Sequence, residues 1–283
     1  MSADWLGALL SPWMLAILGL CIGSFLNVVI HRLPQMMERA WKLEASELLG
    51  STAPELPEIS LSKPGSRCPK CENKIHWYEN IPLVSWLALR GHCSACKTSI
   101  SVRYPLIELA TGGLFALVAW RFGPHLPVLA WCAFVGTLLA LSGIDWDTTL
   151  LPDSLTLPLL WGGLIAAAIG WTIPLDSAVW GAVSGFLTLW AVYWLFKLTT
   201  GKEGMGGGDF KLLAALGAWL GWQMLLPIVL GASLIGAAVG IAMKLSGALR
   251  EGRYVPFGPF LAGAGLVVLF AGSERVMGWL GWA

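Results

Sequence analysis

The chain has 283 residues, of which 56% are hydrophobic and only 12% are charged, and it contains 34 glycines and 17 tryptophans. A water-soluble domain of this length would carry about 25% charged residues and would not repeat apolar stretches long enough to cross about 30 Å of hydrocarbon. The formal net charge of +1 gives no indication of nucleic-acid binding. The composition therefore excludes an ordinary soluble enzyme and predicts an all-α polytopic membrane protein.

Hydrophobic stretches along the chain predict about eight transmembrane helices. The predicted spans cover 12–30, 104–121, 126–144, 155–171, 177–197, 209–224, 226–244 and 256–272. The first span is not expected to be a removable secretory signal, because no basic residue precedes it and positive charge follows it. We expect it to be retained as a helix, with the protein inserted directly into a bacterial-type inner membrane.

The lysines and arginines predict the orientation of these spans. The segment 31–103 holds ten of them, the loops at 197–211 and 244–253 hold three each, and the opposite side keeps only Arg121 and Arg275. Short loops rich in basic residues stay in the cytoplasm. The segment 31–103 is therefore expected to be cytoplasmic, and an even number of spans then places both termini in the periplasm.

Residues 35–49 carry apolar side chains at helical spacing, at Met37, Ala40, Trp41, Ala45 and Leu48. This pattern is typical of an amphipathic helix on the membrane surface and equally of a short solvated connector helix. The residues from 50 to 65 include three prolines and predict an extended loop.

Two Cys-x-x-Cys pairs follow, Cys68-Pro-Lys-Cys71 and Cys93-Ser-Ala-Cys96, with 21 residues between them. This spacing is typical of a tetrahedral zinc site with four thiolate ligands, which leaves no open position for a catalytic water. Disulfides are the alternative, and the reducing cytoplasm disfavours them. The sequence therefore predicts a structural zinc ion.

Other potential metal ligands are expected to play no part in this site. His76 and His92 are nearby spare donors, whereas Cys21 and Cys132 fall within predicted spans and are expected to be small buried hydrophobic residues. The chain then divides into three parts. These are a first transmembrane helix at 1–34, a small cytoplasmic zinc-binding domain at 35–103 between the first two spans, and a seven-helix membrane core at 104–283.

Two aspartates, Asp145 and Asp209, stand at the ends of predicted spans. An ionisable residue at the edge of hydrocarbon is costly and is a candidate functional residue for that reason. Asp209 closes the run Gly204-Met-Gly-Gly-Gly-Asp209, which follows a membrane span instead of a strand and is therefore a poor nucleotide-binding motif. Its glycines permit close backbone approach by a substrate strand.

The helix dipole suggests different roles for the two carboxylates. Asp209 would stand at the start of a helix, which favours its ionised form and a base role, while Asp145 at the end of its own helix would be the acid. Spacing alone leaves other partners open. Asp153 follows a proline and is expected to be a helix N-cap, Asp147 is expected to be solvated, and Glu108 also stands near a membrane edge.

Several blocks of sequence resemble the type IV prepilin peptidases, bifunctional inner-membrane enzymes of type IV pilus assembly and type II secretion. The matching blocks are Gly23-Ser-Phe-Leu-Asn27-Val-Val-Ile-His-Arg-Leu-Pro34, Cys68-Pro-Lys-Cys71, Asn80 to Cys93, Ile100 to Glu108, Ile144-Asp-Trp-Asp, Leu150-Leu-Pro-Asp153, Gly206-Gly-Gly-Asp-Phe-Lys211 and Pro256-Phe-Gly-Pro-Phe-Leu261. They occur in the family's order from residue 23 to residue 261.

The resemblance implies that Asp145 and Asp209 are the catalytic pair of an aspartic peptidase, with Asp209 in the family's Gly-x-Gly-Asp motif. Such an enzyme cleaves the short basic leader of a prepilin or pseudopilin after a glycine, at the cytoplasmic membrane face. It then methylates the new α-amino group with S-adenosylmethionine.

The sequence gives little information on the methyl-donor site, because the soluble segment does not contain the strand, glycine-rich turn and helix of a Rossmann-type fold. Asn27 and Arg32 are polar candidates for it. The alternative is that Gly23 and Ser24 are packing residues, Asn27 bonds between helices, and Arg32 anchors the helix at the membrane surface.

Two other functions stay open at this point. One is a Gly-x-Gly-Asp intramembrane protease without methylation, which is disfavoured because Ile144 precedes Asp145 where presenilin-type enzymes carry Tyr, and no Pro-Ala-Leu tripeptide occurs near the C-terminus. The other is a non-enzymatic membrane scaffold that binds assembly proteins through its zinc domain. That interpretation leaves the two aspartates unexplained. The expected partners are prepilins and membrane lipids, and the sequence does not fix the oligomeric state.

Overall fold

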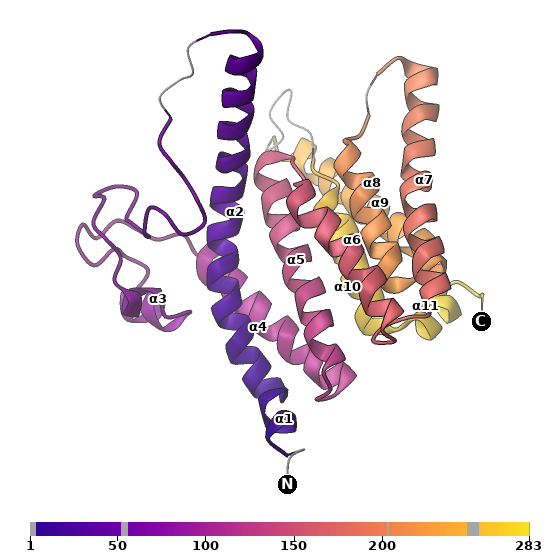
Figure 1. The fold of residues 1–283 in the computed structure, drawn as a ribbon, viewed down its shortest axis with the longest axis horizontal. Coiled ribbons are helices and arrows are strands. Elements are labelled where there is room, and N and C mark those ends of the chain that lie inside the picture. The colour runs from indigo at the N-terminus through magenta and orange to yellow at the C-terminus, as the bar shows by residue number, and fades with distance from the viewer. Residues whose placement is uncertain (1–3, 52–55, 203, 248–254, 283) are drawn as a thin grey trace. The chain divides into compact units, whose positions relative to one another are not determined.

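The computed structural model describes residues 4–51, 56–202, 204–247 and 255–282, and over these ranges the protein consists of helices and loops with two isolated β-bridges (Figure 1). Arg250 and Arg253, two of the basic residues that predict the membrane orientation, lie outside the described residues. The chain forms two compact units, Met1–Val128 and Leu129–Ala283. The predicted all-helical architecture is confirmed.

The first unit is built on two long helices that pack against each other. Its elements are α1 (Asp4–Leu9), α2 (Pro12–Leu48), the short 3-10 helix η1 (Trp77–Asn80), α3 (Val84–Ala88) and α4 (Arg103–Phe122). Glycines on α2 permit the contact with α4, since a Cβ on Gly19 would lie 2.8 Å from the Cα of Gly112, and one on Gly23 would lie 2.7 Å from the Cα of Glu108. Gly23 is therefore a packing residue.

Helix α2 is longer than the first predicted span. It has 37 residues and continues through Pro34, so residues 35–48 form neither a separate surface helix nor a separate connector. Proline removes one backbone donor, and a helix of this length tolerates the single lost bond. At 1.5 Å per residue α2 is about 55 Å long, and it therefore extends well beyond the roughly 30 Å of a hydrocarbon core.

The second unit is a bundle of the remaining helices. They are α5 (Pro127–Thr148, whose first two residues belong to the first unit), α6 (Asp153–Ala168), α7 (Leu175–Thr200), α8 (Gly207–Leu220), η2 (Trp222–Met224), α9 (Leu225–Leu245), α10 (Gly258–Ala271) and α11 (Ser273–Trp279). Helix α8 is largely buried. Its closest neighbour is α7, where a Cβ on Gly181 or Gly217 would overlap the backbone of the facing glycine.

The structure contains five helices that are long and apolar enough to cross a membrane, or six if the bent pair α10 and α11 is one span, within the described residues. Every one of the eight predicted spans corresponds to a helix. Three of them, α6, α8 and α10, have only 16, 14 and 14 residues. A polytopic membrane protein is confirmed. These three helices are shorter than sequence hydropathy implies. For the largely buried α8 the reason is that a helix enclosed by others need not match the bilayer thickness.

Two cysteines outside the metal cluster were predicted to be buried within membrane spans. Cys132 is buried as expected, but Cys21 is exposed on α2, so its prediction as a buried residue is wrong. Trp13 and Trp120, near the ends of α2 and α4, are exposed, as aromatic anchors at a membrane interface are.

Candidate active site and metal centre

Asp145 lies in the last turn of α5 and is buried, with 4% of its surface exposed. Its Oδ2 accepts a 2.9 Å hydrogen bond from the backbone N–H of Gly258, the first residue of α10. A Cβ on Gly258 would lie 2.6 Å from the same oxygen, so the residue at this position must be glycine for the contact to form. The start of α10 thus holds one oxygen of Asp145.

Asp209 is the third residue of α8, which begins after the N-cap residue Gly206. It is 9% exposed, and its Oδ1 is buried without a hydrogen-bond partner among the described residues. Buried carboxylate oxygens are normally paired, so an unpaired one indicates a position for a water molecule or a substrate group. The helix N-terminus next to it favours negative charge, as the sequence predicted.

The structure brings these two carboxylates to one place through Leu151, in the loop between α5 and α6. A Cβ on Gly208 would lie 2.7 Å from the Cβ of Leu151, and one on Gly258 would lie 3.2 Å from its Cδ2. Leu151 therefore separates the residue before Asp209 from the residue that holds Asp145. The carboxylates lie close enough for the charge on Asp145 to act on Asp209.

The other acidic candidates lie elsewhere. Asp147 is exposed. Asp153 is the first residue of α6, after the N-cap residue Pro152, so its prediction as an N-cap is wrong. Instead both of its carboxylate oxygens accept hydrogen bonds of 2.7 Å from Nζ of Lys211, on α8. Sequence reasoning missed Lys211, although the residue stands two positions after Asp209 in the same sequence block.

The glycine run before Asp209 has two kinds of position. A Cβ on Gly204 would lie 2.8 Å from the ring of Phe196, so this glycine is needed for packing within the chain. A Cβ on Gly206 or Gly207 would meet no atom within 4 Å, which leaves open space beside the backbone. This arrangement is compatible with a peptide approaching the start of α8.

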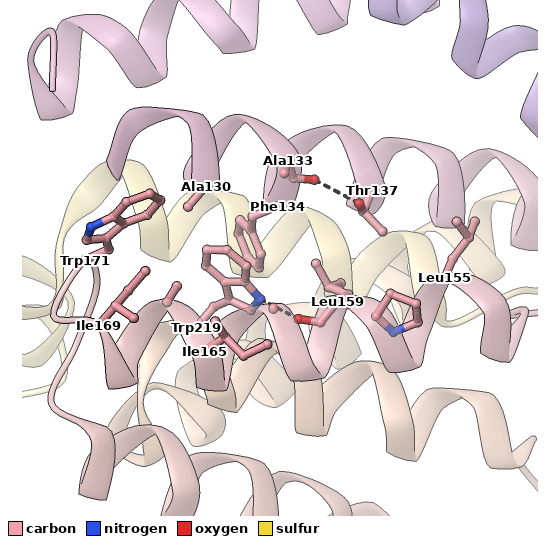
Figure 2. Close-up of a pocket in the computed structure, with 13 residues that line it drawn as sticks. Ala130, Ala133, Phe134, Thr137, Leu155, Leu159, Ile165, Ile169, Trp171 and Trp219 are labelled. Atoms are coloured by element: carbon pink, nitrogen blue, oxygen red, sulfur yellow. Dashed lines mark hydrogen bonds between the residues drawn. The ribbon is translucent and has the colours of Figure 1, made fainter. Parts of the chain in front are cut away.

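A cavity of about 360 Å³ lies between α5 and α6 and is separate from the aspartates (Figure 2). Its lining is apolar, and its polar groups are satisfied internally. The Thr137 hydroxyl donates to the Ala133 carbonyl, and the Trp219 indole N–H donates to the Leu159 carbonyl at 2.8 Å. Because no titratable side chain lines this cavity, it offers no group for acid–base chemistry.

The four cysteines of the first unit form one cluster. The Sγ atoms of Cys68, Cys71, Cys93 and Cys96 all lie within 4.8 Å of one another, and those of Cys68 and Cys96 are 3.7 Å apart. This cluster could hold a metal ion, and neither His76 nor His92 belongs to it. The predicted four-cysteine site between the first spans is confirmed as a geometric cluster.

The two cysteine pairs have the same backbone geometry. The N–H of Cys68 donates to the carbonyl of Asn73, and the carbonyl of Cys68 accepts from the N–H of Glu72. Cys93 makes the same two bonds, with Thr98 and Lys97. The residue after the second cysteine has a positive φ in both, 56° at Glu72 and 58° at Lys97. The two turns are therefore repeats of one knuckle.

Hydrogen bonds favour the thiolate at two cysteines of the cluster, Cys68 and Cys96. Backbone N–H groups of Cys71 and Lys70 lower the pKa of the Cys68 thiol. The hydroxyl and backbone of Thr98 lower the pKa of the Cys96 thiol to about 6. The Cys71 thiol differs, because a backbone hydrogen bond from Asn73 that lowers its pKa is outweighed by burial and by the neighbouring cysteines, which raise it to about 11. Thiolates are the form in which cysteine binds metal ions, so Cys68 and Cys96 are the ligands best prepared for a cation.

The weak methyl-donor candidates are engaged in internal bonds. Asn27 Nδ2 donates to the carbonyls of Gly23 and Tyr104 at 3.2 Å each, which links α2 to α4. Arg32 donates to the carbonyl of Ser60 at 3.0 Å and so holds the loop after α2. Glu108 is also internal, since its Oε2 accepts the backbone N–H of Leu83 at 2.8 Å.

Comparison with known proteins gives matches along almost the whole chain. Residues 17–122 match the bacterial peptidase A24 N-terminal domain, and residues 132–241 match the type IV leader peptidase family. The cysteine cluster falls in the first match, and Asp145 and Asp209 fall in the second. No solved structure matches the chain.

Among curated relatives, a prepilin leader peptidase/N-methyltransferase of Stutzerimonas stutzeri is 55% identical over 94% of this chain and 93% of its own length. Proteins of the same description from Pseudomonas aeruginosa PAO1 and Aeromonas salmonicida are 55% and 51% identical, over 91% and 93% of this chain and 89% and 93% of their own lengths. Identity at this level along nearly all of both chains shows common descent and a common fold. The chain belongs to the type IV leader peptidase family, whose A24 N-terminal domain precedes its peptidase region.

Proposed function

We propose that this protein removes the leader peptide of type IV prepilins or pseudopilins and methylates the new N-terminus. The curated relatives carry both activities in their description, and the chain matches them over more than nine tenths of its length. The cleavage would take place at the cytoplasmic face of a bacterial inner membrane, as the family resemblance implies.

One observation carries the peptidase half of this proposal, namely two buried carboxylates, Asp145 and Asp209, that lie close enough to interact. In an aspartic mechanism one carboxylate activates a water molecule while the other protonates the carbonyl oxygen or the leaving amine. Asp145 and Asp209 supply such a pair, and the open space beside Gly206 and Gly207 leaves room for a peptide.

The hydrogen bonding supports Asp209 as the base of the pair. Its Oδ1 has no partner among the described residues and stands near the N-terminus of α8, where a water molecule can bind it. Asp145 is positioned by Gly258 and would serve as the acid. Because the carboxylates interact, the observable titration belongs to the pair.

The distribution of basic residues and the apolar helices support a specific membrane placement. We propose eight membrane-embedded helices, α2 and α4 to α10, with the cysteine cluster and the aspartates on the cytoplasmic side and both termini in the periplasm. The functional division would be a first transmembrane helix at 1–34, a cytoplasmic metal domain at 35–103 and a membrane core at 104–283. Helix α2 crosses the first of these boundaries without a break.

Zinc fits the cysteine cluster. Zn–S bonds of about 2.3 Å in a tetrahedron require sulfur atoms about 3.8 Å apart, and the Sγ atoms of Cys68 and Cys96 are 3.7 Å apart. With four thiolates no position is left for a substrate, so zinc would hold the two knuckles together and take no part in hydrolysis.

S-adenosylmethionine would supply the methyl group, on the family's description. The hydrogen bonds of Asn27 and Arg32 support structural roles for both side chains, which join α2 to α4 and to the following loop. Neither side chain is therefore proposed to bind the methyl donor.

The deciding experiment uses a purified prepilin and the full-length enzyme in detergent, with products read by mass spectrometry with and without S-adenosylmethionine. Asp145→Asn and Asp209→Asn should each abolish leader removal, whereas the exposed Asp147→Asn should retain it. Leader removal that persists in both active-site variants would refute the peptidase assignment. Cleavage without a mass gain of one methyl group would show that the protein is a peptidase without methyltransferase activity.

A further inference from the structure

An exposed apolar ridge lies between the two cysteine knuckles, in η1, α3 and the turn that joins them. It consists of Trp77, Tyr78, Ile81, Val84 and Leu87, whose exposed fractions are 80%, 52%, 38%, 60% and 67%. Five large apolar side chains within eleven residues form more than the scattered single exposures that are normal on a soluble surface. The ridge therefore needs a covering partner.

The backbone fixes the position of this ridge relative to the membrane. The N–H of Leu83, between Ile81 and Val84, donates to Oε2 of the buried Glu108 in the second turn of α4. A second bond joins the indole N–H of Trp86 to the carbonyl of Ile100, just before α4, at 3.3 Å. Since α4 is a candidate membrane span, these bonds hold the ridge at the level where the chain enters the bilayer.

Figure 1 shows α3 at about the height of the first turns of α4. The outer face of α4 at this level is apolar too, because Tyr104, Leu106 and Leu109 are about half exposed. The ridge and this apolar face of α4 both belong to the first unit and lie at one depth, where lipid would meet them if α4 spans the membrane.

We propose that the ridge docks into the interfacial layer of the phospholipid bilayer and seats the metal domain on the membrane surface. Trp77 and Tyr78 have the amphipathic rings that concentrate at headgroup level, and Val84 and Leu87 lie one turn apart on α3, where they can enter the acyl boundary. The exposed Lys74 and Arg90 flank the ridge and suit anionic headgroups.

The one acidic side chain within the ridge does not oppose this docking. Glu79 accepts the backbone N–H of His76 at 2.8 Å, and it interacts with Ser94 in the second knuckle. Its carboxylate is thus engaged with the knuckle region of the domain. The ridge then presents mainly apolar side chains to the lipid.

The test measures lipid contact in the full-length protein, reconstituted in nanodiscs of phosphatidylethanolamine and phosphatidylglycerol. An environment-sensitive fluorescent amino acid replaces Trp77, Val84 or Leu87, and Lys70, exposed on a knuckle, is the matched control. Quenching by lipid carrying a nitroxide near the headgroup is compared with quenching by aqueous iodide. We expect lipid quenching at the ridge to exceed that at Lys70 by about threefold, and iodide quenching to show the reverse order.

Iodide quenching at the ridge equal to that at Lys70 would overturn the proposal. Protection that arises only when prepilin is added would overturn it as well, because the ridge would then bind substrate instead of lipid. The double variant Val84→Glu/Leu87→Glu should lower lipid quenching of the probe at position 77, with metal content unchanged as the measure of a folded domain. Unchanged quenching in that variant would also count against lipid docking.

Discussion

The backbone N–H of Gly258 donates a 2.9 Å hydrogen bond to Oδ2 of Asp145 across 113 positions of sequence. The bond leaves the other carboxylate oxygen for chemistry and ties the start of α10 to the end of α5. Gly258 is thus a positioning residue for the proposed acid, and its lack of a side chain is part of the arrangement, because a Cβ there would stand 2.6 Å from Oδ2.

Replacing Gly258 with alanine should move Asp145 while leaving the bundle folded. Displacement of a catalytic group by about 1 Å can cost about 100-fold in rate, so we expect leader cleavage by Gly258→Ala to fall by one to two orders of magnitude. The measurement is kcat with a purified prepilin, alongside the melting temperature in detergent.

Gly263→Ala is the control for this substitution. Gly263 lies on the same helix, and a Cβ there would meet no atom within 4 Å. Its activity should match that of the unchanged protein. Full activity of Gly258→Ala at an unchanged melting temperature would contradict the positioning role.

The ion pair between Lys211 and Asp153 should steady the start of α8, which carries Asp209. Both side chains are partly exposed, at 34% and 54%, so the pair is expected to contribute no more than about 1 kcal/mol. Asp153→Asn should therefore reduce cleavage less than tenfold, much less than Asp209→Asn. The exchange of both charges, Asp153→Lys with Lys211→Asp, should recover part of the loss in a double-mutant cycle. Strict additivity of the two single changes would exclude coupling.

Much of the architecture was predictable because membrane insertion imposes simple rules. Long apolar runs predicted the helices α2 and α4 to α10 but not the short α11, and the cysteine spacing predicted the cluster. The lengths of α6, α8 and α10 were not predictable. Helix α8 is enclosed by its neighbours, as the close contact of Gly217 with Gly181 on α7 illustrates, and hydropathy does not record which helix is enclosed.

The sequence predicted Asp145 and Asp209 as the catalytic pair, but it did not predict the residues that contact them or support them. Asp209 stood out through its glycine run, whereas the choice of Asp145 over Asp147 came from family resemblance. The structure adds Gly258, Leu151 and Lys211. Each acts through a contact between segments far apart in sequence, and no local pattern encodes such contacts.

The cysteine cluster predicts a defined metal stoichiometry. Cys71→Ser and Cys96→Ser should each lose most of the bound zinc, because three thiolates with one hydroxyl bind zinc more weakly and metal binding is coupled to folding of the knuckles. Cys21→Ser is the control, since Cys21 is exposed on α2, outside the cluster. Zinc content of the purified protein, measured by atomic emission, should fall in the first two variants and stay at one per chain in the third. Full zinc content in Cys71→Ser would rule out the four-thiolate site.

The two knuckles carry backbone strain that glycine should relieve. Glu72 and Lys97 have φ values of 56° and 58°, in the left-handed region that costs non-glycine residues roughly 1 kcal/mol or more. Both side chains are exposed, so their removal loses little packing. Lys97→Gly and Glu72→Gly should therefore hold zinc more tightly, by up to about fivefold in the chelator concentration needed to remove half of the metal.

Lys70→Gly is the matched control for these substitutions. It also removes an exposed side chain from a knuckle, but Lys70 does not have a positive φ. Glycine there only adds freedom to the unfolded chain, so zinc retention should stay equal or fall slightly. Equal behaviour of Lys70→Gly and Lys97→Gly in the chelator titration would mean that the left-handed position, and with it the repeated knuckle geometry, does not limit metal binding.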